Sequence, residues 1–222
     1  MSSATATHGS SDAGRRANFI AERLGSALAI LPLGVWTLFH LWNNLAAFQG
    51  APAWQTAVTE YPHPFAEGVA LALVLLPLAW HVIWGLQRIG QTRPNYPQYG
   101  YFSNLKYILQ RLAALGLLAF LGAHLWLAFL KPRLLEGEVE PFADIAHEMH
   151  FHRPTLAVYI LGVLAVAYHF GNGVHTAMMG WGVVESKRSL RRSQIVAWAL
   201  FLLMLAMGWG AIFALFQAGK ST

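Results

Sequence analysis

Histidine is unusually frequent in this sequence among the side chains that can bind metals or transfer protons. The 222 residues include ten histidines, as many as Asp and Glu together, and no cysteine. The lack of cysteine excludes disulfides, thiolate-held iron–sulfur clusters, c-type haem attachment and a cysteine nucleophile within this chain. Imidazole therefore remains as the side chain best suited to hold a metal or to move a proton.

Half of these histidines fall in long apolar stretches: His40, His81, His124, His169 and His175. An ionisable side chain at membrane depth predicts a functional site. The alternative for any one of them is a hydrogen bond between neighbouring helices. Histidines in four separate stretches favour the functional interpretation.

The elements that must position them are five apolar stretches, at about 24–48, 68–90, 108–131, 155–180 and 195–217. A bilayer core of about 30 Å needs roughly 20 helical residues, and only helices satisfy their own backbone in lipid. Charged residues make up 11% of the chain, about half the usual share in soluble domains. The sequence thus predicts an all-α integral membrane bundle of five transmembrane helices.

Residues 20–222 are expected to form this single transmembrane domain, preceded by a disordered cytoplasmic tail over 1–19 that is rich in Ser, Ala, Thr and Gly. Pro32 and Pro77 should kink the first two helices. The loops on the N-terminal side carry eleven Lys and Arg, against four on the other side. This bias predicts a cytoplasmic N-terminus in a multi-pass protein of the cytoplasmic (inner) membrane, and it explains the basic charge without nucleic-acid binding.

Depth sorts four of the histidines into two layers. At about 1.5 Å per residue, His40 and His124 lie roughly 24 Å from the cytoplasmic end, and His81 and His169 roughly 14–17 Å from it. Each layer draws its two imidazoles from different helices, as bis-histidine haem b requires. A zinc or copper site would need three or four ligands in one cluster. The pattern therefore predicts two haem b groups.

Small and basic residues on the same helix faces are consistent with haem. Gly85 follows His81 by four residues and Gly173 follows His169 by four, which lets a flat ring approach. Arg88 and Lys131 lie two turns from His81 and His124, where they would neutralise haem propionates. The alternatives are small-residue helix packing and cations that reach the membrane surface.

His175 competes with His169 for the same iron. Six residues turn a helix by about 240°, so the two side chains do not face one metal. His169 is the preferred ligand because it shares the layer of His81. His175 is assigned instead to a haem propionate, a quinone or a partner protein.

The histidines of the first four helices, their absence from the fifth, and the stretch Tyr168-His169-Phe170-Gly171-Asn172-Gly173 resemble the cytochrome b membrane subunit of type B succinate dehydrogenases and fumarate reductases. The resemblance covers roughly 20–217. It implies a di-haem anchor that passes electrons between an iron–sulfur subunit and membrane menaquinone. The pairs implied are His81 with His169 for the cytoplasmic-side haem and His40 with His124 for the outer-side haem.

This resemblance also implies partners. A flavoprotein and an iron–sulfur subunit would dock on the cytoplasmic face, and a higher oligomer of the complex is compatible with it. This chain has neither cysteines nor a Gly-rich nucleotide fingerprint, so FAD, the clusters and the dicarboxylate active site are expected in those partners only. The alternatives are the cytochrome b subunit of a hydrogenase or formate dehydrogenase, docked on the outer face, and a non-redox transporter or anchor.

Candidates for a quinone site lie on the outer side, where polar groups flank the outer pair: Asn43, Asn44, Gln49, His63 and Glu67. Helix capping and interhelical hydrogen bonds are the alternative roles. The loop histidines His147 and His150 stand one residue closer than in a zinc-protease motif. With His152 they are expected to belong to an amphipathic helix at the outer interface.

Overall fold

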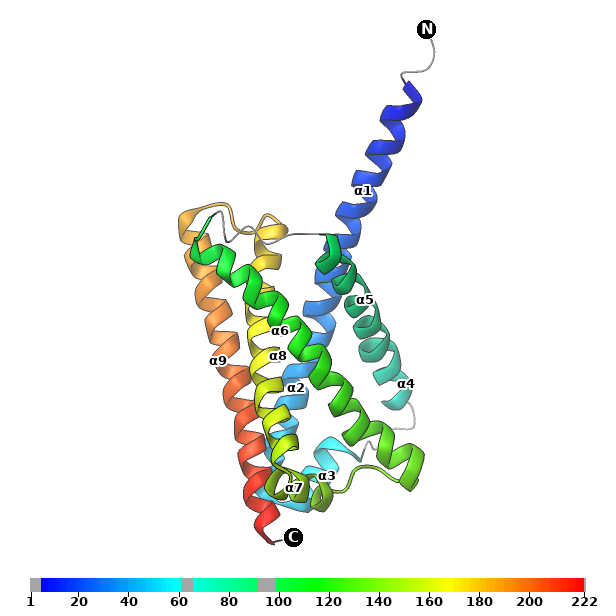
Figure 1. Cartoon of the computed structure of the whole chain (residues 1–222), viewed down its shortest axis with the longest axis vertical. Helices are drawn as coiled ribbons and strands as arrows, with labels where there is room; N and C mark the ends of the chain where they lie inside the picture. Colours follow the sequence, from blue (N-terminus) through cyan, green and yellow to red (C-terminus); the bar gives the residue numbers. More distant parts are fainter. Residues whose placement is uncertain (1–4, 61–65, 92–98, 222) are drawn as a thin grey trace.

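A computed structural model describes residues 5–60, 66–91 and 99–221, and all regular structure within these ranges is helical (Figure 1). Five segments are long and apolar enough to cross a membrane: Phe19–Gln49, Gly68–Gln91, Phe102–Glu136, Arg153–Gly180 and Lys187–Ser221. Each span contains one of the predicted stretches and is longer than it by one or more residues. The prediction of an all-helical bundle with five spans is confirmed.

The first span is built from four consecutive helical pieces: α1 (Thr5–Leu28), η1 (Ala29–Gly34), α2 (Val35–Asn44) and η2 (Leu45–Gln49). Helix α1 begins inside the segment that was expected to be disordered, 1–19, and extends beyond the end of the bundle (Figure 1). Once the span has nucleated the helix, each further residue adds one hydrogen bond, so the helix continues into the tail. The boundary at residue 20 stays a prediction.

Prolines shape the first three spans by opening them into wider π-helical turns. Pro32 lies within η1, and Pro132 begins η5 (Pro132–Glu136) just after η4 (Trp126–Leu130). Pro77 follows η3 (Leu71–Leu75). Proline lacks the N–H that would bond four residues back, and a π turn accommodates the freed carbonyl. The predicted distortions at Pro32 and Pro77 thus take the form of π turns.

The tightest packing joins α6 (Phe102–Leu125), α8 (Arg153–Gly180) and α9 (Lys187–Ala218), with α8 in the middle and α2 also against α9. Glycines permit these close approaches. A Cβ at Gly208 would lie 2.5 Å from Val163, and one at Gly171 would lie 2.7 Å from the Ala197 carbonyl oxygen. Helix α4 (Ala66–Ala70) leads through η3 into α5 (Leu76–Gln91), which packs instead against α1 and η1.

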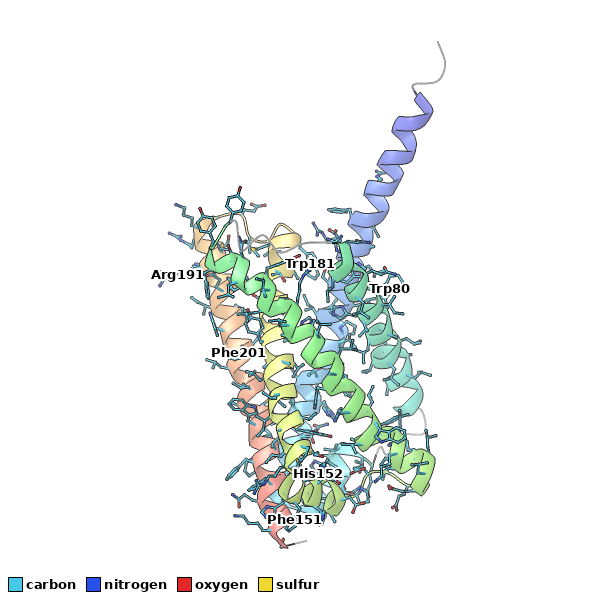
Figure 2. All side chains as sticks on the ribbon, in the orientation of Figure 1. Trp80, Phe151, His152, Trp181, Arg191 and Phe201 are labelled. Atoms are coloured by element: carbon cyan, nitrogen blue, oxygen red, sulfur yellow. The ribbon has the colours of Figure 1, made fainter. Side chains whose placement is uncertain are left out.

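Two short helices close the bundle end opposite the projecting α1: α3 (Ala51–Val58) and α7 (Phe142–Phe151), with η6 (Gly219–Ser221) beside α7. We call this end the cap and the other the N-side. Helix α7 lies within the segment 141–153 where an amphipathic helix was predicted, and it packs its apolar face inward, with Met149 fully buried. Trp54 of α3 is buried beside it. Figure 2 shows Phe151 and His152 at the cap, and Trp181 and Arg191 at the N-side.

Candidate functional site

The first histidine pair lies toward the cap and joins α2 to α6; we call it the cap pair. The ring centroids of His40 and His124 are 5.8 Å apart. Trp36 stacks on His40 at 4.7 Å, and Phe120 stacks on His124 at 5.4 Å. Phe120 reaches this place because residue 162 is a glycine, whose Cβ would lie 2.2 Å from the Phe120 ring.

Polar side chains hold both imidazoles of the cap pair. The Asn44 side-chain amide donates to the carbonyl oxygen of His40 at 2.8 Å, and its nitrogen lies 3.4 Å from His40 Nε2. Trp54 Nε1 donates to Asn44 Oδ1 at 3.1 Å, which connects the pair to the cap. The Tyr159 hydroxyl lies 3.1 Å from His124 Nδ1.

The second pair, His81 from α5 and His169 from α8, lies toward the N-side, and we call it the N-side pair. Its ring centroids are 6.1 Å apart. His81 Nδ1 is buried without a hydrogen-bond partner among the described residues and lies near the main chain of Gly25. Gln110 Nε2 lies 3.2 Å from His169 Nδ1 and donates to the His169 carbonyl oxygen at 2.9 Å.

Both pairs have the spacing that an iron with two axial imidazoles needs. Metal–nitrogen bonds of about 2 Å on both faces would hold the ring centres roughly 6 Å apart. Within the described residues, neither α2 with α6 nor α5 with α8 is a closely packed helix pair, although their imidazoles face each other. A Cβ at Gly85, one turn from His81, would meet nothing within 4 Å. These residues fit haem.

The described residues do not suggest a metal ion bound by protein side chains alone. No cluster of three or more His, Asp or Glu suited to a metal ion occurs in the part of the chain that the structure describes. Two imidazoles per site are the protein ligands that a bis-histidine haem needs, because the macrocycle supplies the other donors. The donor set therefore matches bis-histidine haem better than zinc or copper.

The cations predicted for haem propionates each contact a carboxylate of the protein. Arg88 pairs with Glu22 at 3.0 Å, and Lys131 pairs with Glu136 at 2.9 Å. His175, the third such candidate, turns away from the N-side pair. It is buried at 3% exposure, with its Nδ1 2.9 Å from Ser193 Oγ on α9. The structure does not bring His175 to the N-side histidines.

The quinone candidates fall into three groups. Asn44 contacts His40, whereas Asn43 is half-buried and Gln49 is exposed at the end of η2. His63 lies outside the described residues. Glu67 belongs to α4, but its side chain also lies outside the described part. Of the candidates whose side chains the structure describes, Asn44 alone contacts a histidine of the cap pair.

Loop histidines of the cap have structural contacts. His150 Nδ1 lies 2.9 Å from the carbonyl oxygen of Phe216, and His152 Nδ1 lies 2.6 Å from Thr155 Oγ1. His147 lines a cavity of about 210 Å³ between the end of the third span and α7. These contacts hold α7 to α8 and α9.

That cavity is acidic, with Glu140, Asp144 and Glu148 beside Lys131 and Leu127. Glu140 is 7% exposed. Its burial, and then the negative charge of Asp144, raise the pKa of the Glu140 carboxyl from 4.5 to about 7. Glu140 therefore changes charge near neutral pH.

Comparison with known proteins settles the family. Residues 90–208 match the profile of the succinate dehydrogenase/fumarate reductase transmembrane subunit. The chain belongs to this family. It is also 30% identical over 198 residues to the succinate dehydrogenase cytochrome b558 subunit of Bacillus subtilis (strain 168), covering 88% of this chain and 96% of that protein. The predicted relationship is confirmed, and the chain is a multi-pass cytochrome b membrane anchor of the succinate dehydrogenase/fumarate reductase family.

Two residues of this anchor were missed by sequence reasoning, Tyr159 and Gln110, which contact the two pairs. Gln110 lies eight residues from Phe102, where the third span begins, and His169 lies eleven residues from Gly180, where the fourth ends. A helix predicted to start at Phe102 would therefore have placed Gln110 near the depth of His169. The predicted start at 108 placed Gln110 at the membrane surface. Tyr159 was not predicted, because its contact with His124 depends on how α8 is rotated against α6, which no local pattern in the sequence shows.

Proposed function

We propose that this chain is a di-haem anchor that carries electrons between the iron–sulfur subunit of a succinate:quinone, or quinol:fumarate, oxidoreductase and membrane menaquinone. The proposal rests on the two histidine pairs. Their ring centroids are 5.8 and 6.1 Å apart, and each pair connects two helices that do not pack closely. His81 and His169 hold the cytoplasmic-side haem, and His40 and His124 hold the outer-side haem.

Membership of the family supports this assignment over the two alternatives. This chain matches the succinate dehydrogenase/fumarate reductase transmembrane subunit over 90–208 and a succinate dehydrogenase cytochrome b subunit over 88% of its length, as expected for such an anchor. The flavoprotein and iron–sulfur subunits dock on the N-side, which faces the cytoplasm. Arg191 lies at this end, in agreement with the excess of Lys and Arg there (Figure 2).

Each part of the chain has a defined task in this function. When bound, haem b supplies one-electron transfer between its ferric and ferrous states. The imidazoles fix its position, and the apolar helices exclude water. Arg88 and Lys131 offer positive charge to the propionates on the two sides. Asn44, which contacts His40, is the strongest remaining candidate to hydrogen-bond a quinone oxygen near the cap.

The test is haem content in the purified complex. The wild type should hold two haem b per chain, measured as the pyridine haemochrome. His81→Ala and His169→Ala should each remove the same haem, and His40→Ala and His124→Ala the other. His175→Ala is the matched control, because this histidine is buried on α8 like His169 but faces Ser193, and it should retain both haems.

Other outcomes would contradict the assignment. A folded wild-type complex without haem would refute the function. A variant of His40 that removes the same haem as a variant of His81 would refute the pairing while leaving the function in place.

A further inference from the structure

The two pairs differ in what faces the second ring nitrogen of a ligand histidine. A histidine that binds a metal through Nε2 keeps its hydrogen on Nδ1, and that hydrogen needs an acceptor. A good acceptor raises the basicity of the imidazole and strengthens its bond to the metal. The groups around Nδ1 of His124 and His169 therefore affect the iron of each site differently, given the proposed function.

His124 has a well-placed acceptor in the Tyr159 hydroxyl, 3.1 Å from its Nδ1. The Tyr159 ring is 8% exposed and packs edge-to-face on Phe120 at 5.3 Å, which in turn stacks on His124. This three-ring arrangement fixes the hydroxyl. If a haem iron were held on Nε2, His124 Nδ1–H would donate to the Tyr159 oxygen.

His169 faces a donor instead. Two hydrogen bonds fix the Gln110 amide: Nε2 donates to the His169 carbonyl oxygen at 2.9 Å, and Oε1 accepts from Asn172 Nδ2 at 2.8 Å. If the Gln110 amide were turned over, its oxygen would face the His169 carbonyl oxygen and its nitrogen would face Asn172 Nδ2. The amide therefore presents N–H to His169 Nδ1, at 3.2 Å.

If a haem iron were held on Nε2 of His169, the Nδ1–H would need another acceptor. The one available from Gln110 is its main-chain carbonyl oxygen, 3.5 Å from Nδ1. This is long for an N–H···O bond, which usually measures about 2.7–3.2 Å. His169 therefore has a weaker acceptor than His124.

We propose that Tyr159 and Gln110 are positioning residues that give the two haem-ligand histidines unequal basicity and so separate the midpoint potentials of the two haems. The more basic His124 stabilises ferric iron and lowers the potential of the outer-side haem. The less basic His169 leaves the potential of the cytoplasmic-side haem higher.

The first experiment is a spectroscopic redox titration of the purified complex with Tyr159→Phe. This change keeps the ring packing and removes only the acceptor, so the potential of the outer-side haem should rise while the other stays unchanged. Tyr168→Phe is the matched control. It removes a buried hydroxyl from the same helix, one without a hydrogen-bond partner among the described residues, and should shift neither potential.

The second variant, Gln110→Met, removes the opposing donor and lets His169 Nδ1–H approach the main-chain oxygen, so the potential of the cytoplasmic-side haem should fall. Unchanged potentials in both variants, with both haems present, would overturn the inference but not the proposed function. The order is tested separately in the wild type. Loss of the higher-potential haem in His124→Ala would also overturn the inference, whereas loss of the lower-potential one would support it.

Discussion

The buried carboxyl of Glu140 should make the stability of the cap depend on pH. Its pKa is about 7 in the folded chain and 4.5 when exposed. The folded state therefore holds a proton over a pH range in which the unfolded state has released it. Stability from this group is fully present below pH 4.5 and is lost as pH rises through 7. The difference in pKa corresponds to roughly 3 kcal/mol, at about 1.4 kcal/mol per unit.

The perturbation is Glu140→Gln, which keeps the shape and cannot ionise. At pH 5 the variant and the wild type should have similar free energies of unfolding. By pH 8 the variant should be more stable by up to roughly 3 kcal/mol, because it avoids burying a negative charge beside Asp144. The assay is unfolding by sodium dodecyl sulfate in mixed micelles from pH 5 to 8, followed by tryptophan fluorescence.

Glu138→Gln is the matched control, since Glu138 is exposed in the same loop and loses the same charge. Its free energy of unfolding should track the wild type at every pH. A difference between Glu140→Gln and the wild type that stays constant across the range would refute the reasoning, because it would show that Glu140 does not change charge there.

Three further predictions concern other parts of the anchor. Gly162→Ala places a Cβ 2.2 Å from the Phe120 ring, so it should lower the free energy of unfolding by about 1–3 kcal/mol and deplete the outer-side haem. Gly122→Ala is the control, because a Cβ there meets nothing within 4 Å, and it should retain both haems in the haemochrome assay. Ser186→Ala removes the side-chain cap of α9 and should lower the free energy of unfolding by about 1 kcal/mol in the same detergent titration. Arg88→Gln breaks an ion pair whose side chains are 43% and 38% exposed, so stability should change by less than about 1 kcal/mol. If Arg88 also holds a propionate, the cytoplasmic-side haem should be lost on washing, and equal retention would argue against that role.

Hydropathy and length were sufficient to predict the spans, because lipid allows a backbone few alternatives to the helix. The two layers of histidines also followed from counting. His40 lies 21 residues after Phe19 and His124 lies 22 after Phe102, while His81 lies ten before Gln91. The first and third spans both begin five or six residues earlier than predicted, so His40 and His124 still lie at similar depths.

Contacts that depend on rotation about a helix axis were not predictable in the same way. The contact of His175 with Ser193 is an example, because the packing of α8 between α6 and α9 decides which side of α8 is interior. The role of His175 at a propionate stays a prediction. Gln55 illustrates the other limit. It accepts from the Phe142 main-chain N–H at 3.0 Å and so joins α3 to the start of α7 across 87 positions, a contact with no local pattern.

The π turns at the prolines affect how a position along a span translates into a direction. An α-helix advances about 100° per residue, and a π turn takes up one residue more than an α turn. Residues before and after η1 therefore belong to two different helical wheels, although they lie in one continuous span. A deletion of one residue within Ala29–Gly34 would bring the two wheels into phase and rotate His40 relative to α1. Insertions and deletions in these short segments are thus a route by which the faces of one helix can be reassigned without substituting any residue of the two histidine pairs.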